Sequence, residues 1–312
     1  MAVVQTLGVV SCLGGPMRFC GFAAEMLRDL FSLQKQNRVQ LHWRMFYPEM
    51  QVSKENSLAK LNKAIGQFTE ERTQAYQRFL VIGGDHSCAM GTWGGVLNGL
   101  QQPDKFGLIW LDAHMDAHTY LTSPSGNVHG MPVAALLGKA DEKLAAMYPS
   151  HHFITPAYLS LIGVRDYEQE EYDLLTQAGV EIVFANPRNG LAYALNAAIN
   201  KLSMTCHTIG ISIDLDVIDP TDAPGVETPA QGGIKAKELL SALAVIKGNP
   251  KICGLELSEF SPENDINNKT LHLMKAIVEA FYGEPDFPLE SSKPNKFLGS
   301  SSSGNKGKAV PS

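Results

Sequence analysis

The segment Asp112-Ala113-His114-Met115-Asp116 places three ionisable side chains at alternate positions. It follows the apolar run 106–111, which is typical of a strand buried on both faces of a parallel sheet. Alternate residues of such a strand point to the same side, and open α/β sheets bind ligands just beyond the carboxyl ends of their strands. Crowded ionisable groups would repel or desolvate one another there, and a divalent metal ion would compensate them. The segment therefore predicts metal binding, and the alternative is a solvated acidic loop.

Ionisable residues also follow three other apolar runs, 79–82, 208–213 and 252–257. In that order they are His86, the pair Asp214 and Asp216, and Glu259. Because the carboxyl ends of parallel strands share one edge of a sheet, these side chains can converge with those of the first segment. Any one of them could instead be a helix cap, a turn residue, a core histidine or a surface carboxylate. Their recurrence at four strand ends favours a metal site.

The charges and ligand types indicate which metal such a site would hold. Four aspartates carry four negative charges, which two divalent ions would balance; they are Asp112, Asp116, Asp214 and Asp216. Paired ions that share bridging carboxylates typically lie ~3.5–4 Å apart. Carboxylate oxygens with two imidazoles and no thiolate favour Mn²⁺ over Zn²⁺ or Cu, and leave Co, Ni and Fe open. We therefore expect two Mn²⁺ ions per subunit.

The elements that must position these residues alternate along the chain. Eight short apolar runs are interpreted as strands: 6–12, 39–46, 79–82, 106–111, 159–164, 180–184, 208–213 and 252–257. Helical apolar spacing lies between them, for example at Leu58, Leu61, Ile65 and Phe68, with Ser57 as the expected cap. This order predicts an α/β fold in which a mostly parallel sheet of about eight strands is covered by helices on both sides.

Composition and length bound the class of protein. The chain has 312 residues, 44% of them hydrophobic, and a net charge of −6, so nucleic acid is not an expected partner. No window approaches the ~20 apolar residues of a membrane helix, and the N-terminus lacks the basic region of a secretory signal. Five scattered cysteines fit a reducing, cytoplasmic location. We expect one domain over residues 1–283 and a disordered tail over 284–312, which is rich in Ser, Gly, Lys and Pro.

Three segments together resemble the signatures of the ureohydrolases, the superfamily that comprises arginase, agmatinase, formimidoylglutamase and their relatives. They are Gly83–Ser87, Asp112–Asp116 and Ser212–Pro220, and the similarity extends over roughly residues 5–283. The resemblance, which is greatest to arginase, implies a single three-layer α/β/α domain with a binuclear manganese centre. It assigns one ion to His86, Asp112, Asp116 and Asp214, and the other to Asp112, His114, Asp214 and Asp216. It also implies a hydroxide between the two ions that attacks a guanidinium carbon.

Further residues would act on the substrate. Glu259 is the expected anion that clamps the guanidinium, and Asp116 would steer the reaction intermediate from the metal side. His129 is the expected proton shuttle, because an imidazole titrates near the working pH. By the same resemblance, Thr228 matches a threonine near the guanidinium.

The other end of the substrate would meet two segments. The run Ser125–Gly130 resembles the arginase loop, in which Ser125 and Asn127 would bind an α-carboxylate. Glu168 matches an acid that points toward the α-amino group, where arginases usually have aspartate. His118 replaces the asparagine of animal-type arginases, so it would bind the carboxylate or mark a different substrate.

These expectations amount to an amidinohydrolase that converts L-arginine to L-ornithine and urea. One alternative is a ureohydrolase for another guanidino or formimino compound, such as formimidoylglutamate, a guanidino acid or agmatine. A second alternative is a non-catalytic family member, although all six metal ligands are present. The resemblance further implies a homo-oligomer, as a trimer or a hexamer.

Overall fold

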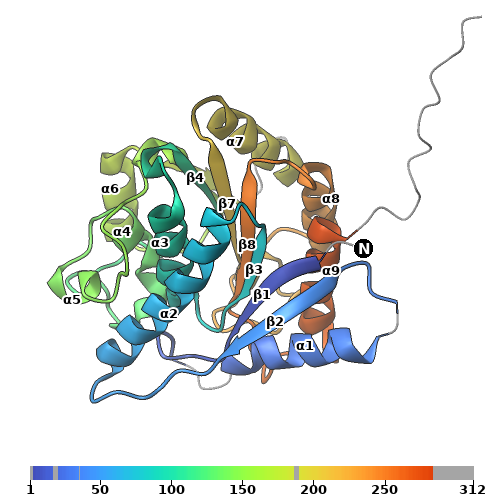
Figure 1. Cartoon of the computed structure of the whole chain (residues 1–312). Helices are drawn as coiled ribbons and strands as arrows, with labels where there is room; N and C mark the ends of the chain where they lie inside the picture. Colours follow the sequence, from blue (N-terminus) through green and yellow to red (C-terminus); the bar gives the residue numbers. More distant parts are fainter. Residues whose placement is uncertain (1–2, 17–19, 35, 186–189, 284–312) are drawn as a thin grey trace, which may run out of the picture.

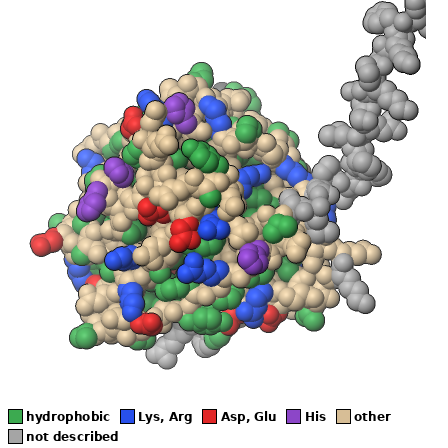
Figure 2. Space-filling model, in the orientation of Figure 1, with side chains coloured by type: hydrophobic (Ala, Val, Ile, Leu, Met, Phe, Trp, Pro, Cys, Tyr) green, Lys and Arg blue, Asp and Glu red, His purple; other side chains and the backbone are tan. Residues whose placement is uncertain are grey.

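The computed structural model describes residues 3–16, 20–34, 36–185 and 190–283. Most of the predicted domain, 1–283, is thus described, whereas the predicted tail, 284–312, lies outside the described residues. Within these ranges, no helix combines the length and the apolar character that crossing a bilayer requires. Figure 2 shows acidic and basic side chains interspersed over the face that it presents, which is typical of a solvated surface.

Eight strands form one sheet, and every neighbouring pair in it is parallel (Figure 1). The strands are β1 (Val3–Val9), β2 (Gln40–Phe46), β3 (Phe79–Ile82), β4 (Phe106–Leu111), β5 (Leu159–Val164), β6 (Glu181–Phe184), β7 (Thr208–Asp214) and β8 (Ile252–Ser258). Their order across the sheet is β2-β1-β3-β8-β7-β4-β5-β6. The predicted parallel, eight-stranded α/β fold is therefore confirmed.

Helices cover both faces of this sheet (Figure 1). They are α1 (Ala23–Leu33), α2 (Lys54–Gln74), α3 (Ala89–Gly99), α4 (Pro132–Leu136), α5 (Glu142–Ala145), α6 (Gln169–Ala178), α7 (Leu191–Thr205), α8 (Ala236–Ile246) and α9 (Lys269–Tyr282). One apolar core contains side chains of α1, α7, α8 and α9, and the other contains side chains of α2, α3, α4 and α6. The predicted three layers are thus present.

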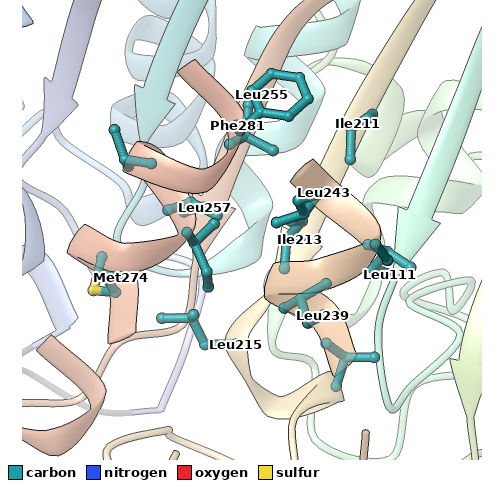
Figure 3. Packing of buried hydrophobic residues seen from close by; sticks show 14 of the residues in the cluster. Leu111, Ile211, Ile213, Leu215, Leu239, Leu243, Leu255, Leu257, Met274 and Phe281 are labelled. Atoms are coloured by element: carbon teal, nitrogen blue, oxygen red, sulfur yellow. The ribbon is translucent and has the colours of Figure 1, made fainter. Parts of the chain in front are cut away.

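Strand residues alternate between the two cores, as the pleat requires. In β4, Leu108 and Trp110 belong to one core, whereas Ile109 and Leu111 belong to the other. Figure 3 shows the core that contains Ile109 and Leu111, in which side chains of β4, β7 and β8 meet those of α8 and α9. The labelled residues include Leu111, Ile211, Ile213, Leu255, Leu257, Leu239, Leu243, Met274 and Phe281. Because the central strands are buried on both faces, their carboxyl ends are held rigidly, which suits a site with several ligands.

Two local predictions need correction. The expected cap Ser57 lies inside α2, where its hydroxyl donates to the Ser53 carbonyl at 2.9 Å. The cap is Ser53, whose Oγ accepts the Asn56 amide at 3.1 Å, because the helix begins one turn before its apolar stripe. The first strand runs from Val3 to Val9 rather than over 6–12. Beyond it, the chain passes so close to Gly84 that a side chain there would collide with the Ser11 carbonyl.

Candidate functional site

Sheet topology brings together the four strand ends that carry the predicted metal and substrate residues. Strands β3, β8, β7 and β4 are consecutive neighbours in the sheet. Their carboxyl ends lead to His86, Glu259, Asp214 and Asp112, respectively. Parallel pairing places all four ends at the same edge, so residues up to 173 positions apart in the sequence come into contact.

One buried cluster surrounds the His86 imidazole. Its Nδ1 atom lies 3.2 Å from Asp112 Oδ2, 3.0 Å from Asp116 Oδ2 and 3.1 Å from Asp214 Oδ2. All four side chains are buried, and their ligand atoms lie within 4.8 Å of one another. His86 Nδ1 and Asp116 Oδ2 are buried without a hydrogen-bond partner. Buried polar atoms are normally paired, so these two atoms have the surroundings expected of metal ligands.

A second cluster consists of Asp112, His114 and Asp216. His114 Nδ1 lies 3.0 Å from Asp216 Oδ2 and 3.5 Å from Asp112 Oδ1. Asp112 thus presents one oxygen to each cluster, the position that a bridging carboxylate would occupy. Asp214 differs, because its Oδ2 faces His86 while its Oδ1 accepts the Asp216 amide at 2.8 Å. The structure places Asp214 in the first cluster only.

The electrostatics of the site call for a cation. Burial raises the pKa of Asp116 to about 7, and the charge of Asp112 adds to the increase. Burial, together with the charges of Asp216 and Asp112, raises the pKa of Asp214 well above its usual range. Carboxylates packed this closely are costly unless an opposite charge compensates them. The oxygen and imidazole donors and the unpartnered atoms therefore fit a pair of divalent ions.

The backbone is strained at two of the predicted residues. Asp116 has φ of 50° and Glu259 has φ of 65°, both in the left-handed region that is unusual for residues other than glycine. Such conformations persist only where the surrounding structure holds them, and they concentrate at functional sites.

A buried chain of hydrogen bonds holds the His86 ring from behind. His86 Nε2 lies 3.1 Å from Ser212 Oγ, and Ser212 donates to Glu256 Oε2 at 2.7 Å. With Ser212 donating to Glu256, its oxygen is free to accept the Nε2 proton, which leaves the Nδ1 lone pair facing the carboxylates. Trp110 stacks on the His86 ring at 4.1 Å and donates to Asp112 Oδ2 at 2.8 Å.

The sequence interpretation missed Glu256, although a signal for it was present. Glu256 lies within the apolar run of β8 and is fully buried. Its second oxygen, Oε1, accepts the Thr92 hydroxyl at 2.8 Å. A charged residue inside an otherwise apolar strand must be paired, and that alone singles it out.

A cavity of about 220 Å³ opens above the two clusters. Most of the predicted substrate residues line it, namely Ser125, Asn127, His129, Glu168, Thr228 and His118. Thr228 donates to Asp216 Oδ2 at 3.2 Å, which ties one wall of the cavity to the second cluster. Ser125 Oγ accepts the Asn127 amide at 3.2 Å across Gly126, whose φ of 69° favours glycine.

Glu259 does not line the cavity but lies behind His129. Its Oε1 atom is 3.2 Å from His129 Nδ1 and accepts the His86 amide at 2.6 Å. Burial raises the pKa of Glu259 to about 8, and the charge of Asp85 adds to the increase. Glu227, which the sequence interpretation did not single out, joins His129 and Glu259 in one group of potential ligands.

His118 lies between two glutamates that line the cavity with it. Its Nε2 atom is 3.1 Å from Glu168 Oε2 and 3.5 Å from Glu171 Oε2. Its Nδ1 atom is 3.1 Å from the Thr122 hydroxyl. The ring is buried, whereas the Glu168 side chain keeps 55% of its surface exposed. His118 therefore holds Glu168 in place while leaving its carboxylate open to the cavity.

Glu171 is a second residue that the sequence interpretation missed. It is buried, and its two oxygens accept the amides of Ala117 and Glu168 at 2.9 and 3.1 Å. Burial raises the pKa of its carboxyl to about 7. The spacing Glu168-x-x-Glu171 at the start of α6 forms a reciprocal capping box. This spacing was visible in the sequence. It predicts where a helix begins, however, and not that Glu171 lines a cavity.

Comparison with known sequences identifies one family. The model of the Arginase family matches residues 18–283. An arginase from Bacillus caldovelox is 35% identical over 230 residues, which are 73% of this chain and 76% of that protein. An arginase from Brevibacillus brevis is 31% identical over 271 residues, which are 86% of this chain and 90% of that protein.

Solved structures agree with this result. The Bacillus caldovelox arginase structure matches with a TM-score of 0.81 at 29% identity and covers 92% of this chain and 100% of that chain. Formimidoylglutamase from Bacillus subtilis matches with a TM-score of 0.74, covering 90% of this chain and 86% of that chain. Its identity of 20% shows a shared fold alone.

Proposed function

The chain belongs to the arginase family of amidinohydrolases, and we propose that it hydrolyses L-arginine to L-ornithine and urea with two manganese ions. The observation that carries the proposal is the pair of His/Asp clusters that share Asp112 beneath a cavity of about 220 Å³. A cavity of this size suits a small guanidino substrate rather than a macromolecule. The acidic residues Glu168 and Glu171 in its wall favour a substrate with an ammonium group beside them.

The two clusters supply the ligands for both ions. His86, Asp112, Asp116 and Asp214 would hold one ion, and Asp112, His114 and Asp216 the other. The resemblance also gave Asp214 to the second ion, but its Oδ1 accepts the Asp216 amide. Their oxygen and imidazole donors, without a thiolate, favour Mn²⁺. Two such ions would act as Lewis acids and supply a hydroxide nucleophile near neutral pH.

His129 and Glu259 serve the reacting end of the substrate. His129 lines the cavity and is the residue that would protonate the leaving amine. Glu259, 3.2 Å from His129 Nδ1, would fix the orientation of the imidazole. The charges of the two ions would favour the carboxylate form of Glu259 against the effect of its burial. Its negative charge would then offset the repulsion between a guanidinium and the metal pair. Asp116 and Thr228 would orient the reacting carbon from the side of the clusters.

The amino-acid end of the substrate would be bound by residues at the rim of the cavity. Ser125 and Asn127 would bind the α-carboxylate, and Glu168 the α-ammonium. Glu168 is one methylene longer than the aspartate usual in arginases, and its hydrogen bond to His118 holds the longer side chain back. His118 would therefore position Glu168, whereas the sequence had suggested that it binds the α-carboxylate directly. Assembly as a trimer or hexamer, and a cytoplasmic location, remain predictions.

The test is an assay of the Mn²⁺-loaded protein. Urea release would be measured with L-arginine, agmatine and guanidinobutyrate, and formamide or ammonia release with N-formimino-L-glutamate. We expect L-arginine to be preferred and Asp116→Ala to abolish its hydrolysis. Preference for agmatine would overturn the roles of Ser125 and Asn127. Two bound metals without hydrolysis of any of these compounds would overturn the proposed function.

A further inference from the structure

Two cysteines lie side by side where β1 ends and α1 begins. The Cys20 thiol donates to the carbonyl of Ser11, the residue before Cys12, at 3.9 Å. The amide of Gly21, the residue after Cys20, donates to the Cys12 sulfur at 3.0 Å. Both cysteines are free thiols. The hydrogen bond that Cys12 accepts from the backbone stabilises a thiolate.

The two thiols differ in accessibility and in acidity. Cys12 is half-buried and lines a cavity of about 290 Å³ with Leu13, Phe22 and Pro48. Cys20 is fully buried. The neighbouring Cys20 side chain and the Gly21 amide lower the pKa of Cys12, although burial opposes them. The Cys12 side chain and burial raise the pKa of Cys20. An accessible, acidic thiol beside a buried partner is the arrangement of an oxidation-sensitive pair.

The other cysteines lack these features. Burial raises the pKa of the Cys88 thiol well above its usual range and that of Cys253 to about 12. Burial also raises the pKa of Cys206. A reagent that selects thiolates would therefore reach Cys12 first.

We propose that Cys12 and Cys20 are a modification site that reacts with peroxides and closes to a disulfide. In the first step the Cys12 sulfur attacks one oxygen of hydrogen peroxide, the O–O bond breaks, and a sulfenic acid forms with release of the other oxygen as hydroxide. In the second step the Cys20 sulfur attacks the Cys12 sulfur, the S–O bond breaks, and the hydroxyl leaves as water with the Cys20 proton. Two thiols are oxidised, and one peroxide is reduced to two waters.

The pair is joined to the active-site region by a short segment of backbone. Gly14, two residues after Cys12, donates its amide to Asp85 Oδ2 at 3.0 Å. Its carbonyl accepts the His129 amide at 3.2 Å. A side chain at Gly14 would collide with Asp85, so this segment packs closely against the residue that precedes His86. A disulfide holds its two sulfurs at about 2.05 Å. Closing it would alter the Cys12 backbone, and Gly14 would carry that change to the His129 amide.

The experiment begins with the Mn²⁺-loaded full chain and hydrogen peroxide. Peptide mapping by mass spectrometry should find a linked pair of peptides containing Cys12 and Cys20, lighter by two hydrogens. Cys12 should be lost about tenfold faster than Cys253, since the thiolate is the reacting form. Cys20→Ser should stop at the sulfenic acid, which dimedone traps. Cys12→Ser should block the linkage, and Cys253→Ser is the matched control that should leave it unchanged.

The effect on catalysis rests on the proposed arginase activity, whereas formation of the disulfide does not. Oxidation should lower urea release on the order of tenfold, since small displacements of catalytic groups are costly. Dithiothreitol should restore the rate, and Cys12→Ser should resist peroxide. Absence of the linkage in the unmutated protein would overturn the site. A linkage without change in urea release would overturn its coupling to His129. If no guanidino compound is hydrolysed, the mapping and trapping results still decide the modification.

Discussion

The two ends of the cavity are built differently. The metal end is formed by side chains that follow directly from buried strands, and His86, Asp112 and Asp216 are fully buried. The end proposed to bind the amino-acid part of the substrate is formed by loops, where Ser125 is exposed and Glu168 retains 55% of its side-chain surface. Rigid strand ends suit chemistry that needs several ligands in one geometry. Loops can change without disturbing the core, which suits selection among substrates. We therefore expect changes at the metal end to abolish the reaction, and changes at the loop end to alter substrate preference.

The largest effect is expected for Asp112→Asn. This carboxylate presents one oxygen to each cluster, so its loss should weaken both metal sites. We expect activity to fall on the order of 10³-fold, about 4 kcal/mol of transition-state stabilisation. Metal content by mass spectrometry and urea release would be measured together. Asp104→Asn, at an exposed aspartate, is the matched control. Two tightly bound metals and near-normal activity in Asp112→Asn would remove the basis for a shared ligand.

A smaller effect is expected for residues that hold a metal ligand in position without binding the metal themselves. Ser212→Ala breaks the link between His86 and Glu256 and frees the imidazole to change its orientation. Loss of such partners typically costs ~10–100-fold in metal affinity. Metal titration by calorimetry would measure it. Ser160→Ala is the control, since Ser160 is an equally buried strand serine that bonds Glu181 instead. Equal losses in both variants would mean that the sheet, rather than the hydrogen-bonded chain, determines metal affinity.

The contrast between the two ends also accounts for what the sequence could predict. Strand ends were readable because buried parallel strands produce dense apolar runs, and ionisable residues at alternate positions directly after such a run are costly unless they bind something. His86, Asp112, His114, Asp116, Asp214 and Asp216 meet in the structure as this reasoning expects. Sheet order was not readable, because nothing in local spacing states that β8 lies between β3 and β7.

The residues that sequence reasoning missed depend on tertiary contacts. Glu256 becomes significant only because Ser212 and Thr92 arrive from other elements. Glu259 was predicted as the anion that clamps the guanidinium, but its position behind His129 rather than in the cavity wall is also a matter of tertiary contacts. His118 was noticed as a departure from arginases, but its place between Glu168 and Glu171 follows from the packing of α6. Spacing along a chain carries no information on such contacts.

At the loop end we expect a change in binding without a loss of metal. Asn127→Ala removes one hydrogen-bonding group proposed for the α-carboxylate. The apparent KM for L-arginine should rise at least about tenfold, since one hydrogen bond to a charged group contributes ~1.5–3 kcal/mol. Agmatine, which lacks the carboxylate, should be unaffected, so the ratio of the two substrates is the measurement. Leu121→Ala is the control, because this exposed side chain belongs to the same loop region but does not line the cavity. A parallel fall in metal content would contradict the separation of the two ends.

The smallest effect is expected outside both ends of the cavity, at the start of α2. Ser53→Ala removes the side chain that accepts the Asn56 amide. Loss of such a cap lowers the free energy of unfolding by ~1 kcal/mol, which chemical denaturation of the metal-free protein would measure. Metal content and KM should remain unchanged, because α2 contributes no residue to either cluster or to the cavity wall. This variant shows what a purely structural loss does to the assays. If it raised KM as much as Asn127→Ala does, the Asn127 effect would reflect general destabilisation, and the separation of the cavity into a metal end and a substrate-reading end would fail.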